Sequence, residues 1–325
     1  MDFCRRRFLQ LAAGSVALPA MSRLALAQAY PAQAVRILVG FPAGGVFDVV
    51  ARILADWLSL RLGQPFIVEN RPGAGGNVAA EAVARATADG YTLLAIGSPN
   101  AINASLYGKL GYDFVRDIAP IASTVVLPNV MQVNPSVPAA TVPEFIAYAK
   151  ANPGALSVAS AGNGTSGHLS GELFKSMTGV TLVHVPYRGG PPALTDLMSG
   201  QVQLMFDALA NSLELIKSGR LRALAVTTTN RTPVLPDVPT VGEFVPGYEA
   251  SLWNGLGAPK GTPAEIVHKL NTEINAALED PKIKARLTAL GGTVLPGADD
   301  DFEKFIIQEI NKWAQVLKFS GAKPS

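Results

Sequence analysis

The sequence predicts an α/β protein of two hinged domains, each a βα sheet flanked by helices. Residues 35–96 and residues 142–227 both alternate short apolar strands with amphipathic helical segments, which is the order typical of a parallel sheet covered by helices. Between them, residues 118–134 form a mostly apolar extended run that is long for one strand inside a domain. We therefore expect this run to leave the first domain and enter the second.

The first half of the chain supplies three strands and two helices. Residues 48–62 have helical periodicity, and Gly63 and Pro65 end that helix. Residues 97–103 are expected to be a loop, followed by a turn-rich piece through residue 117. The expected strands are 35–41, 66–69 and 91–96, and the expected helices are 46–62 and 77–88.

The second series of strands and helices follows the extended run. Pro143 stands in the first turn of a helix, where proline is favoured. The expected helices are 142–150, 165–177, 191–199 and 213–218, and the expected strands are 156–160, 182–185, 202–206 and 221–227.

The chain then crosses back and ends in helices. Residues 231–247 are a proline-rich loop, residues 249–258 are extended, and helices are expected at 264–278, 281–290 and 299–319. The predicted first domain comprises residues 28–126 and 251–325, and the second comprises residues 127–250. The two hinge crossings fall near 120–134 and 249–258, an arrangement suited to closure around a ligand.

The first 27 residues are typical of an export signal. Residues 5–9 carry a twin-arginine pattern, residues 9–21 are largely apolar, and residues 25–27 form a small-x-small cleavage site. Pro19 and Arg23 interrupt the apolar stretch, which is too short for a spanning helix. We expect cleavage after about Ala27 and a mature protein in the periplasm.

Charge and cysteine content exclude several classes of function. Four of the 27 basic residues lie in the first 27 positions, which leaves the remainder close to neutral, so nucleic-acid binding has no electrostatic support. The one cysteine, Cys4, leaves with the expected signal. The mature chain then has no disulfide, thiolate nucleophile or cysteine metal ligand.

Two glycine-containing loops are the main functional signal. The first loop (residues 42–45) and the second loop (residues 160–164) each lie between a strand and a helix start. Unpaired N–H groups and the positive end of the dipole make a helix start an anion site, and glycine lets the backbone approach a ligand closely. We expect the two loops to face each other across a cleft and to hold a small carboxylate.

Several motifs in order give the chain its resemblance to a known family. They are FPAGGxxD at 41–48, VENRPGAGGN at 68–77, NxSLY at 103–107, the 162–169 loop, HVPYxG at 184–189, MFD at 205–207, RALAVT at 222–227 and LPDVPT at 235–240. The set resembles the solute receptors of the tripartite tricarboxylate transporter system, the Bug family, over nearly the whole mature chain.

The resemblance implies a type II periplasmic binding fold that captures small organic anions. Dicarboxylates, tricarboxylates, acidic amino acids and aromatic acids are the ligands of this class, and the partners are the membrane permease subunits of the transporter. We expect a monomer without cofactor or metal.

The candidate ligand-binding residues combine the family's loops with polar residues at strand ends. The loops imply Gly44, Gly45, Asp48, Gly162, Asn163, Gly164, Thr165, Ser166 and His168, together with Asp207; Ala43, Phe47, Ser98, Asn103 and Tyr187 complete the set. At position 47 the family usually has a small hydroxyl residue, commonly Thr. Phe47 therefore favours a less polar or ring-bearing acid.

Sequence leaves the roles of several residues open. Asp48 either complements the helix dipole or orients water or a ligand ammonium group. His168 either meets the ligand or satisfies a loop carbonyl, and His184 is expected to be a satisfied core group. Arg188 is either a carboxylate clamp or a solvated side chain. Three scattered histidines do not indicate a metal site.

A second class of function, an exported cofactor-dependent enzyme using the same cleft, has weaker support. Residues 162–167 read G-x-G-x-x-G after a strand, but a dinucleotide site would place an acidic residue about 20 positions later, and residues 183–186 contain none. A Gly-x-Ser-x-Gly motif is absent, and Ser166 and His168 are too close in sequence to form a catalytic pair from spacing alone. A ligand-sensing subunit is a third possibility, because it uses the same closure.

Overall fold

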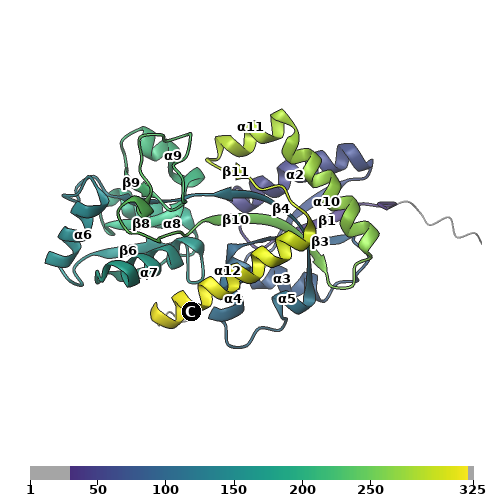
Figure 1. The fold of residues 1–325 in the computed structure, drawn as a ribbon, viewed down its shortest axis with the longest axis horizontal. Helices are drawn as coiled ribbons and strands as arrows, with labels where there is room; N and C mark the ends of the chain where they lie inside the picture. The colour runs from purple at the N-terminus through teal and green to yellow at the C-terminus, as the bar shows by residue number, and fades with distance from the viewer. Residues whose placement is uncertain (1–29, 321–325) are drawn as a thin grey trace, which may run out of the picture. The chain divides into compact units, whose positions relative to one another are not determined.

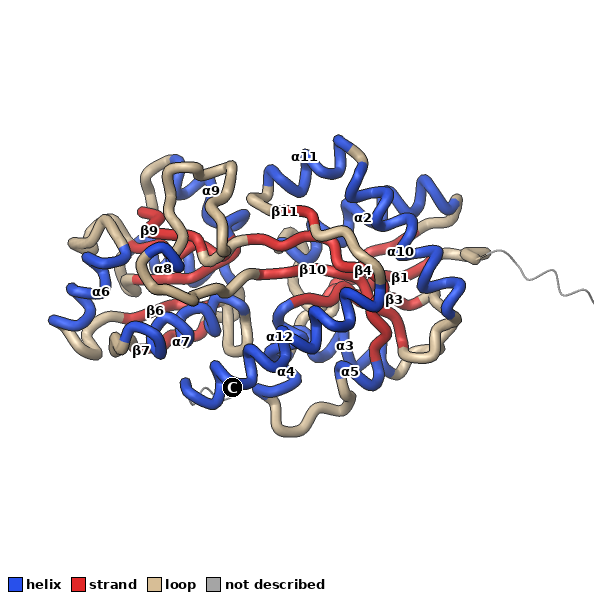
Figure 2. The backbone as a smooth tube through the Cα atoms, in the orientation of Figure 1, coloured by secondary structure: helices blue, strands red, loops and turns tan. Residues whose placement is uncertain are grey.

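Two mixed sheets organise the protein in a computed structural model that describes residues 30–320 (Figures 1 and 2). Both sheets belong to one compact unit of the chain, which begins at Gln33. The larger sheet has the order β11-β4-β10-β3-β1-β2, and the smaller has the order β7-β6-β8-β5-β9. The elements around the larger sheet are called the first lobe, and those around the smaller sheet the second lobe.

The first lobe begins with the parallel pairing that the sequence predicts. β1 (Val35–Val39) pairs in parallel with β2 (Phe66–Asn70) on one side and β3 (Thr92–Gly97) on the other. The connections contain α2 (Val46–Leu62), the short 3-10 turn η1 (Ala74–Gly76) and α3 (Asn77–Ala84). Leu54 and Leu58 of α2 are almost fully buried, and each such burial contributes roughly 1.5–3 kcal/mol.

The rest of the first lobe includes a helix where the sequence suggested a loop. Residues 97–103 were expected to be irregular, which is wrong: α4 runs over Ser98–Leu106. The Asn100 side chain accepts a hydrogen bond from the Gly97 N–H at 2.9 Å and Pro99 occupies the first turn, so local capping starts this helix.

The remaining elements of the first lobe make its sheet mixed. β10 lies antiparallel to both β3 and β4. These elements are α5 (Phe114–Asp117), β4 (Ile118–Leu127), β10 (Leu252–Pro259), α10 (Ala264–Glu279), α11 (Pro281–Ala289), β11 (Thr293–Val294) and α12 (Asp299–Ser320).

In the second lobe, three parallel strands bring their carboxyl ends to one edge of the sheet. β6 (Ser157–Ser160) pairs in parallel with β7 (Val183–Pro186) and β8 (Leu204–Ala208). β5 (Asn129–Val133) runs antiparallel between β8 and β9 (Arg222–Val226), so Asn129 lies opposite Ala208 at that same edge. The helical elements are α6 (Val142–Ala151), α7 (Ser166–Thr178), α8 (Gly190–Ser199), α9 (Leu209–Lys217) and the 3-10 turn η2 (Val241–Glu243).

The long extended run is divided between the two sheets. β4 belongs to the larger sheet and β5 to the smaller, with only Pro128 between them. Proline lacks the N–H that a continuous ladder would need. β10 returns the chain to the larger sheet from Leu252, so two extended segments connect the lobes.

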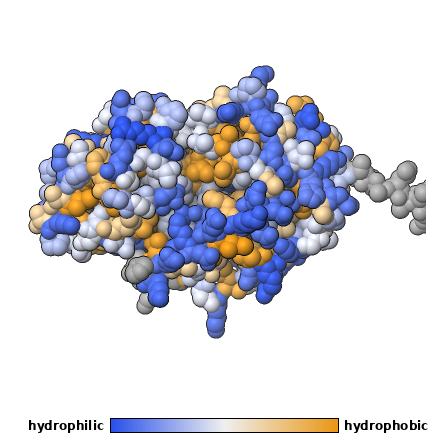
Figure 3. Space-filling view, in the orientation of Figure 1, coloured by the Kyte–Doolittle hydropathy of each residue, from blue (hydrophilic) through white to orange (hydrophobic). Residues whose placement is uncertain are grey.

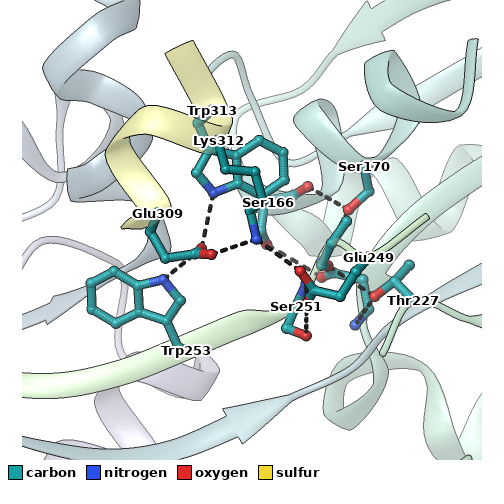
Figure 4. A network of polar contacts seen from close by, with 11 residues as sticks. Ser166, Ser170, Thr227, Glu249, Ser251, Trp253, Glu309, Lys312 and Trp313 are labelled. Atoms are coloured by element: carbon teal, nitrogen blue, oxygen red, sulfur yellow. Dashed lines mark hydrogen bonds and ion pairs between the residues drawn. The ribbon is translucent and has the colours of Figure 1, made fainter. Parts of the chain in front are cut away.

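Helix α12 packs against elements of both lobes. It contacts α4 and β4 of the first lobe and α7 of the second. The indole N–H groups of Trp253 and Trp313, both buried, donate to Glu309 Oε2 at 3.0 and 3.1 Å, and Lys312 Nζ lies 2.8 Å from Glu249 Oε2 (Figure 4). The outer side of α12 forms a hydrophilic stripe (Figure 3).

The expected export signal, residues 1–27, lies outside the described residues. Within the described range, none of the helices combines the length and apolar character that a bilayer span requires.

Candidate ligand-binding site

The first loop is held in shape by Asp48 in the first turn of α2. One carboxylate oxygen of Asp48 accepts hydrogen bonds from the Gly44 N–H at 2.9 Å and Arg52 Nε at 3.0 Å. The other accepts from Arg52 Nη2 and Asn70 Nδ2, both at 2.9 Å. These bonds use the roughly four acceptor positions of a carboxylate, so the geometry favours a structural role for Asp48.

The ionisation of Asp48 follows from the same contacts. Burial acts to raise the pKa of Asp48, but the hydrogen bonds from Arg52, Gly44 and Asn70 outweigh it and hold the pKa below its usual value. A carboxylate that is ionised near pH 7 at a helix start also complements the helix dipole.

We predict that Asp48→Ala lowers the free energy of unfolding at pH 7 by about 1–3 kcal/mol, because the hydrogen bonds from Gly44, Arg52 and Asn70 to a buried carboxylate are lost. A lowered folded-state pKa gives stability that is present above the unfolded pKa and is lost as the pH falls through the folded pKa. The variant and the wild type should therefore converge in acid. Urea unfolding of both proteins, from pH 7 down into acid, measures the difference in their free energies of unfolding. Equal stability at pH 7 would contradict the role assigned to Asp48.

The donors that remain at the first loop belong to the helix start. The Gly44 N–H is bonded to Asp48, and the Gly45 N–H donates to Pro42 O at 3.4 Å. Gly45 caps α2 without a side chain, and the first N–H groups of a helix have no partner within it. The amides of Val46 and Phe47 are thus the groups that can meet an anion.

The Phe47 side chain forms an apolar surface beside these amides. Its ring stacks on Phe41, with centroids 4.8 Å apart and planes at 19°, and the residue is 6 % exposed. A Cβ on Gly97 would lie 2.3 Å from Phe47 Cε1, so the ring fits directly over Gly97. The preference for a less polar or ring-bearing acid stays a prediction.

The second loop also uses its own glycine amides internally. The Gly162 N–H donates to Ser160 Oγ at 3.2 Å, and the Gly164 N–H donates to His168 Nδ1 at 3.1 Å. Thr165 caps α7, because its Oγ1 accepts from the His168 N–H at 3.3 Å. The amides of Ser166 and Gly167, at the start of the first turn, remain for an anion.

The third glycine of the G-x-G-x-x-G sequence serves packing. A Cβ on Gly167 would lie 2.1 Å from Phe206 O, so the start of α7 rests directly on β8. The close contact between α7 and β8 is enough to explain why position 167 is glycine, so this glycine does not imply a dinucleotide-binding site.

Under the second loop, two histidines are stacked, which the sequence did not suggest. The rings of His168 and His184 have centroids 4.1 Å apart and planes at 16°, so the expectation that the histidines are scattered is wrong for this pair. Burial, then His184 and Lys175, lower the pKa of His168 to about 3; burial, then Lys175, lowers the pKa of His184 to about 4. Both rings are neutral near pH 7.

A cation fits this cluster poorly. His168, Glu172 and His184 bring ligand atoms within 4.8 Å of one another. However, Lys175 Nζ already contacts both Glu172 carboxylate oxygens at 2.8 and 2.9 Å. Because His168 Nδ1 accepts from a backbone N–H, its proton lies on Nε2, the nitrogen that faces Glu172 at 3.8 Å. The two neutral histidine rings instead support the second loop, because His168 accepts from the Gly164 N–H and His184 contacts Ser160 Oγ.

Asn103 lies where the first lobe contacts the second loop. Its Nδ2 donates to Gly75 O at 2.9 Å and to Asn77 Oδ1 at 3.2 Å, whereas its Oδ1 has no hydrogen-bond partner among the described residues. A Cβ on Gly164 would lie 2.7 Å from that oxygen and 2.8 Å from Leu106 Cδ2. The approach of the two lobes therefore requires glycine at position 164.

Asp207 is a buried carboxylate at the carboxyl edge of the second lobe. Its only side-chain partner recorded in the described part of the chain is Asn211, whose Nδ2 lies 3.3 and 3.2 Å from the two oxygens. Burial raises the pKa of Asp207 to about 7. The start of α8 is close, since a Cβ on Gly190 would lie 3.7 Å from Asp207 Oδ2.

The remaining candidates differ in exposure. Ala43 is exposed and Asn163 is half-buried. The Tyr187 hydroxyl donates to Asp196 Oδ2 at 2.6 Å, and Arg188 is exposed. His184 lies 2.7 Å from Ser160 Oγ through Nε2, as expected of a satisfied group.

Sequence reasoning missed Asn129, which connects the second loop to both crossings. Asn129 Oδ1 accepts from Ser166 Oγ at 3.3 Å, and its Nδ2 donates to Ser170 Oγ and Ala250 O, both at 3.2 Å. Its backbone N–H donates to Thr227 Oγ1 at 3.0 Å. Figure 4 shows Ser166, Ser170 and Thr227 in this network. An asparagine following a proline in an extended run gave no sequence signal for this role.

Two α/β lobes joined by extended segments, with a helix start from each lobe near the junction, define a solute-binding protein. Residues 50–321 match the model of the tripartite tricarboxylate transporter family receptor, and the chain belongs to that family.

Relatives and solved structures agree with this family. The chain is 39 % identical over 300 residues to Protein BugT of Bordetella pertussis, which covers 91 % of this chain and 92 % of BugT. The structure of R. palustris Rpa4515 with adipate is similar at 40 % identity and a TM-score of 0.86, covering 91 % of this chain and all of that one. MatC from Rhodopseudomonas palustris with bound malate is similar at 35 % identity and a TM-score of 0.81, covering 89 % of this chain and all of that one.

Proposed function

We propose that this protein is a periplasmic receptor that closes its two lobes on one small organic carboxylate and delivers it to the permease of a tripartite tricarboxylate transporter. The observation that carries the proposal is that, among the described residues, the amides of Val46 and Phe47 at the start of α2 and of Ser166 and Gly167 at the start of α7 have no recorded partner, while the loops before them use their glycine amides internally. Helix starts of this kind bind anions without a charged side chain.

The relatives solved with adipate and with malate point to a diacid as the ligand class. Phe47 and Phe41 add an apolar surface next to the α2 amides, which suits the hydrocarbon part of a longer or ring-bearing acid. We propose that such acids bind more tightly than short hydroxylated ones.

The moving parts follow from the two sheets. We propose that residues 28–126 and 251–325 form one domain and residues 127–250 the other, with hinges at the β4–β5 junction and before β10. Exclusion of water on closure strengthens the contacts between dipoles and the ligand charge.

We propose a binding role and no catalysis. The family whose model matches this chain is a family of receptors. Ser160 Oγ does lie 2.7 Å from His184 Nε2, but no carboxylate among the described residues is hydrogen-bonded to that histidine, so the orienting group that acyl transfer needs is not in place. Incubation with the bound acid, followed by mass analysis of the acid, tests this: we expect unchanged acid, and turnover would favour an enzyme.

The ligand class is tested by native mass spectrometry of protein purified from its host, followed by a thermal-shift screen of aliphatic diacids, hydroxylated diacids and benzoate-type acids. We expect a co-purified carboxylate and the largest shifts with adipate-length or aromatic acids. Stabilisation by small polar diacids alone would contradict the role given to Phe47, and stabilisation by no carboxylate would contradict the proposed function.

A further inference from the structure

The side-chain amide of Asn254 is buried near the start of β10, where the chain re-enters the larger sheet, and its Nδ2 is unpartnered within the described part of the chain. Asn254 is the third residue of β10 and is 3 % exposed. Its Nδ2 has no hydrogen-bond partner among residues 30–320, although its backbone carbonyl accepts from Thr124 Oγ1 at 2.9 Å. A buried unsatisfied donor costs stability, so a purely structural reason for this asparagine is missing.

The strand register places the Asn254 side chain beside α2, the helix that follows the first loop. Asn254 lies directly opposite Gly97 in the antiparallel pair of β10 and β3, and directly opposed residues project to the same face of a sheet. A Cβ on Gly97 would point at the Phe47 ring, 2.3 Å away. The face that Asn254 shares with Gly97 is therefore the face covered by the start of α2.

A second unpartnered polar group lies next to this position. Ser98, which follows Gly97 and opens α4, is fully buried, and its Oγ also has no partner within the described chain. Two hydrogen-bonding side chains without a partner in the described chain thus lie around Gly97, the residue that the Phe47 ring of α2 covers. Buried polar groups in native proteins are normally satisfied, so this pair indicates a polar guest.

We propose that Asn254 is a specificity-determining residue that donates a hydrogen bond from its side-chain amide to a carboxylate oxygen of the bound ligand, alongside the amides at the start of α2. This inference rests on the proposed function. An amide donor adds no charge, so it complements the helix start without creating a fixed ion pair. It also selects for an oxygen acceptor, because a ligand without one leaves the donor unsatisfied.

The test uses Asn254→Leu, which keeps the side-chain size and removes the donor. Without ligand, the variant should melt at the same temperature as wild type or higher, because an unsatisfied buried group has been removed. Its affinity for adipate or malate, measured by calorimetry with the acid that the wild type binds more tightly, should fall at least about tenfold, the loss expected for one hydrogen bond to a charged group. A structural role would give the opposite pattern, a lower melting temperature.

Gln132→Leu is the matched control. Gln132 is also fully buried and has an unpartnered Oε1, but it lies inside the smaller sheet on β5, and its replacement should leave affinity within about twofold of wild type.

A measurement on the unaltered protein covers the case in which the variant does not fold. With ¹⁵N-asparagine labelling, one side-chain NH₂ pair should shift on saturation with the acid, and Asn254→Asp, which introduces an acceptor, should lack that pair. Wild-type affinity in Asn254→Leu, or no shifted NH₂ pair, would overturn the inference while the proposed function stands. If the wild type binds no carboxylate, the proposed function itself fails.

Discussion

Gly164→Val abolishes ligand binding while the protein stays folded: we expect the dissociation constant to rise at least about 100-fold, which corresponds to about 2.7 kcal/mol. Gly164 has φ +76°, and a Cβ there would lie 2.7 Å from Asn103 Oδ1 and 2.8 Å from Leu106 Cδ2. Asn103 is fixed by its bonds to Gly75 and Asn77, and Leu106 is buried. Because neither neighbour can yield cheaply, the second loop must move away from α4.

That movement separates the two helix starts that the ligand is proposed to join. The valine branches enlarge the clash beyond that of alanine, and the altered loop also displaces the Gly164 N–H from His168 Nδ1. Calorimetry with adipate or malate measures the loss, and circular dichroism reports the fold.

Gly179→Val provides the control for backbone strain. Gly179 ends the same helix with φ +70°, and its Cβ would meet no atom within 4 Å. Valine in the left-handed region is unfavourable at both sites, so both variants carry a similar cost of backbone strain, but only Gly164→Val adds the clash that separates the lobes. Equal affinity in the two variants would contradict the contact assigned to Gly164.

Asp207→Asn should stabilise the protein at pH 8 and leave its stability near pH 4 close to that of wild type. Burial raises the pKa of Asp207 to about 7 from an ordinary value of 3.8. A raised folded-state pKa means that the folded protein binds the proton more tightly than the unfolded chain. The stability is fully present below the unfolded pKa and is lost as the pH rises from about 4 to about 7.

The effect is large because no cation among residues 30–320 is recorded against the Asp207 carboxylate. The charged residues of the packed elements are engaged or exposed elsewhere: Glu172 with Lys175 on α7, Asp196 with Tyr187 on α8, and Glu214 with Lys217 on α9. The neutral amide of the variant removes the cost of ionisation, which is up to roughly 4 kcal/mol at pH 8.

Urea unfolding of wild type and Asp207→Asn between pH 4 and pH 8 measures this prediction. Asp196→Asn is the control, because that carboxylate is half-buried and already accepts the Tyr187 hydroxyl; it should show no gain at high pH. A difference between Asp207→Asn and wild type that does not change with pH would show that Asp207 is not held in its protonated form.

Local patterns in the sequence were enough to predict the parallel part of the fold and both loops. Strand–loop–helix boundaries are set by neighbouring residues, as with the Thr165 cap and the Gly63 end of α2. The helix α4 was missed because its capping residue, Asn100, lies inside a stretch that reads as polar loop.

Contacts between distant residues could not be predicted in this way. His184 lies within β7 and His168 in α7, the helix that follows β6, so the two rings come together only because β6 and β7 pair in parallel. Asn129 and Asn254 gain their positions from sheet register across the two crossings. The pairing register between strands that are distant in the chain cannot be deduced from a single sequence.

A crystal structure of the protein with adipate or malate, whichever acid binds more tightly, tests the account most directly. We predict that carboxylate oxygens lie about 3 Å from the amides at the start of α2 and from those at the start of α7, with Phe47 against the carbon chain. An acid held by one lobe alone, or by exposed basic side chains with both helix starts facing solvent, would contradict it.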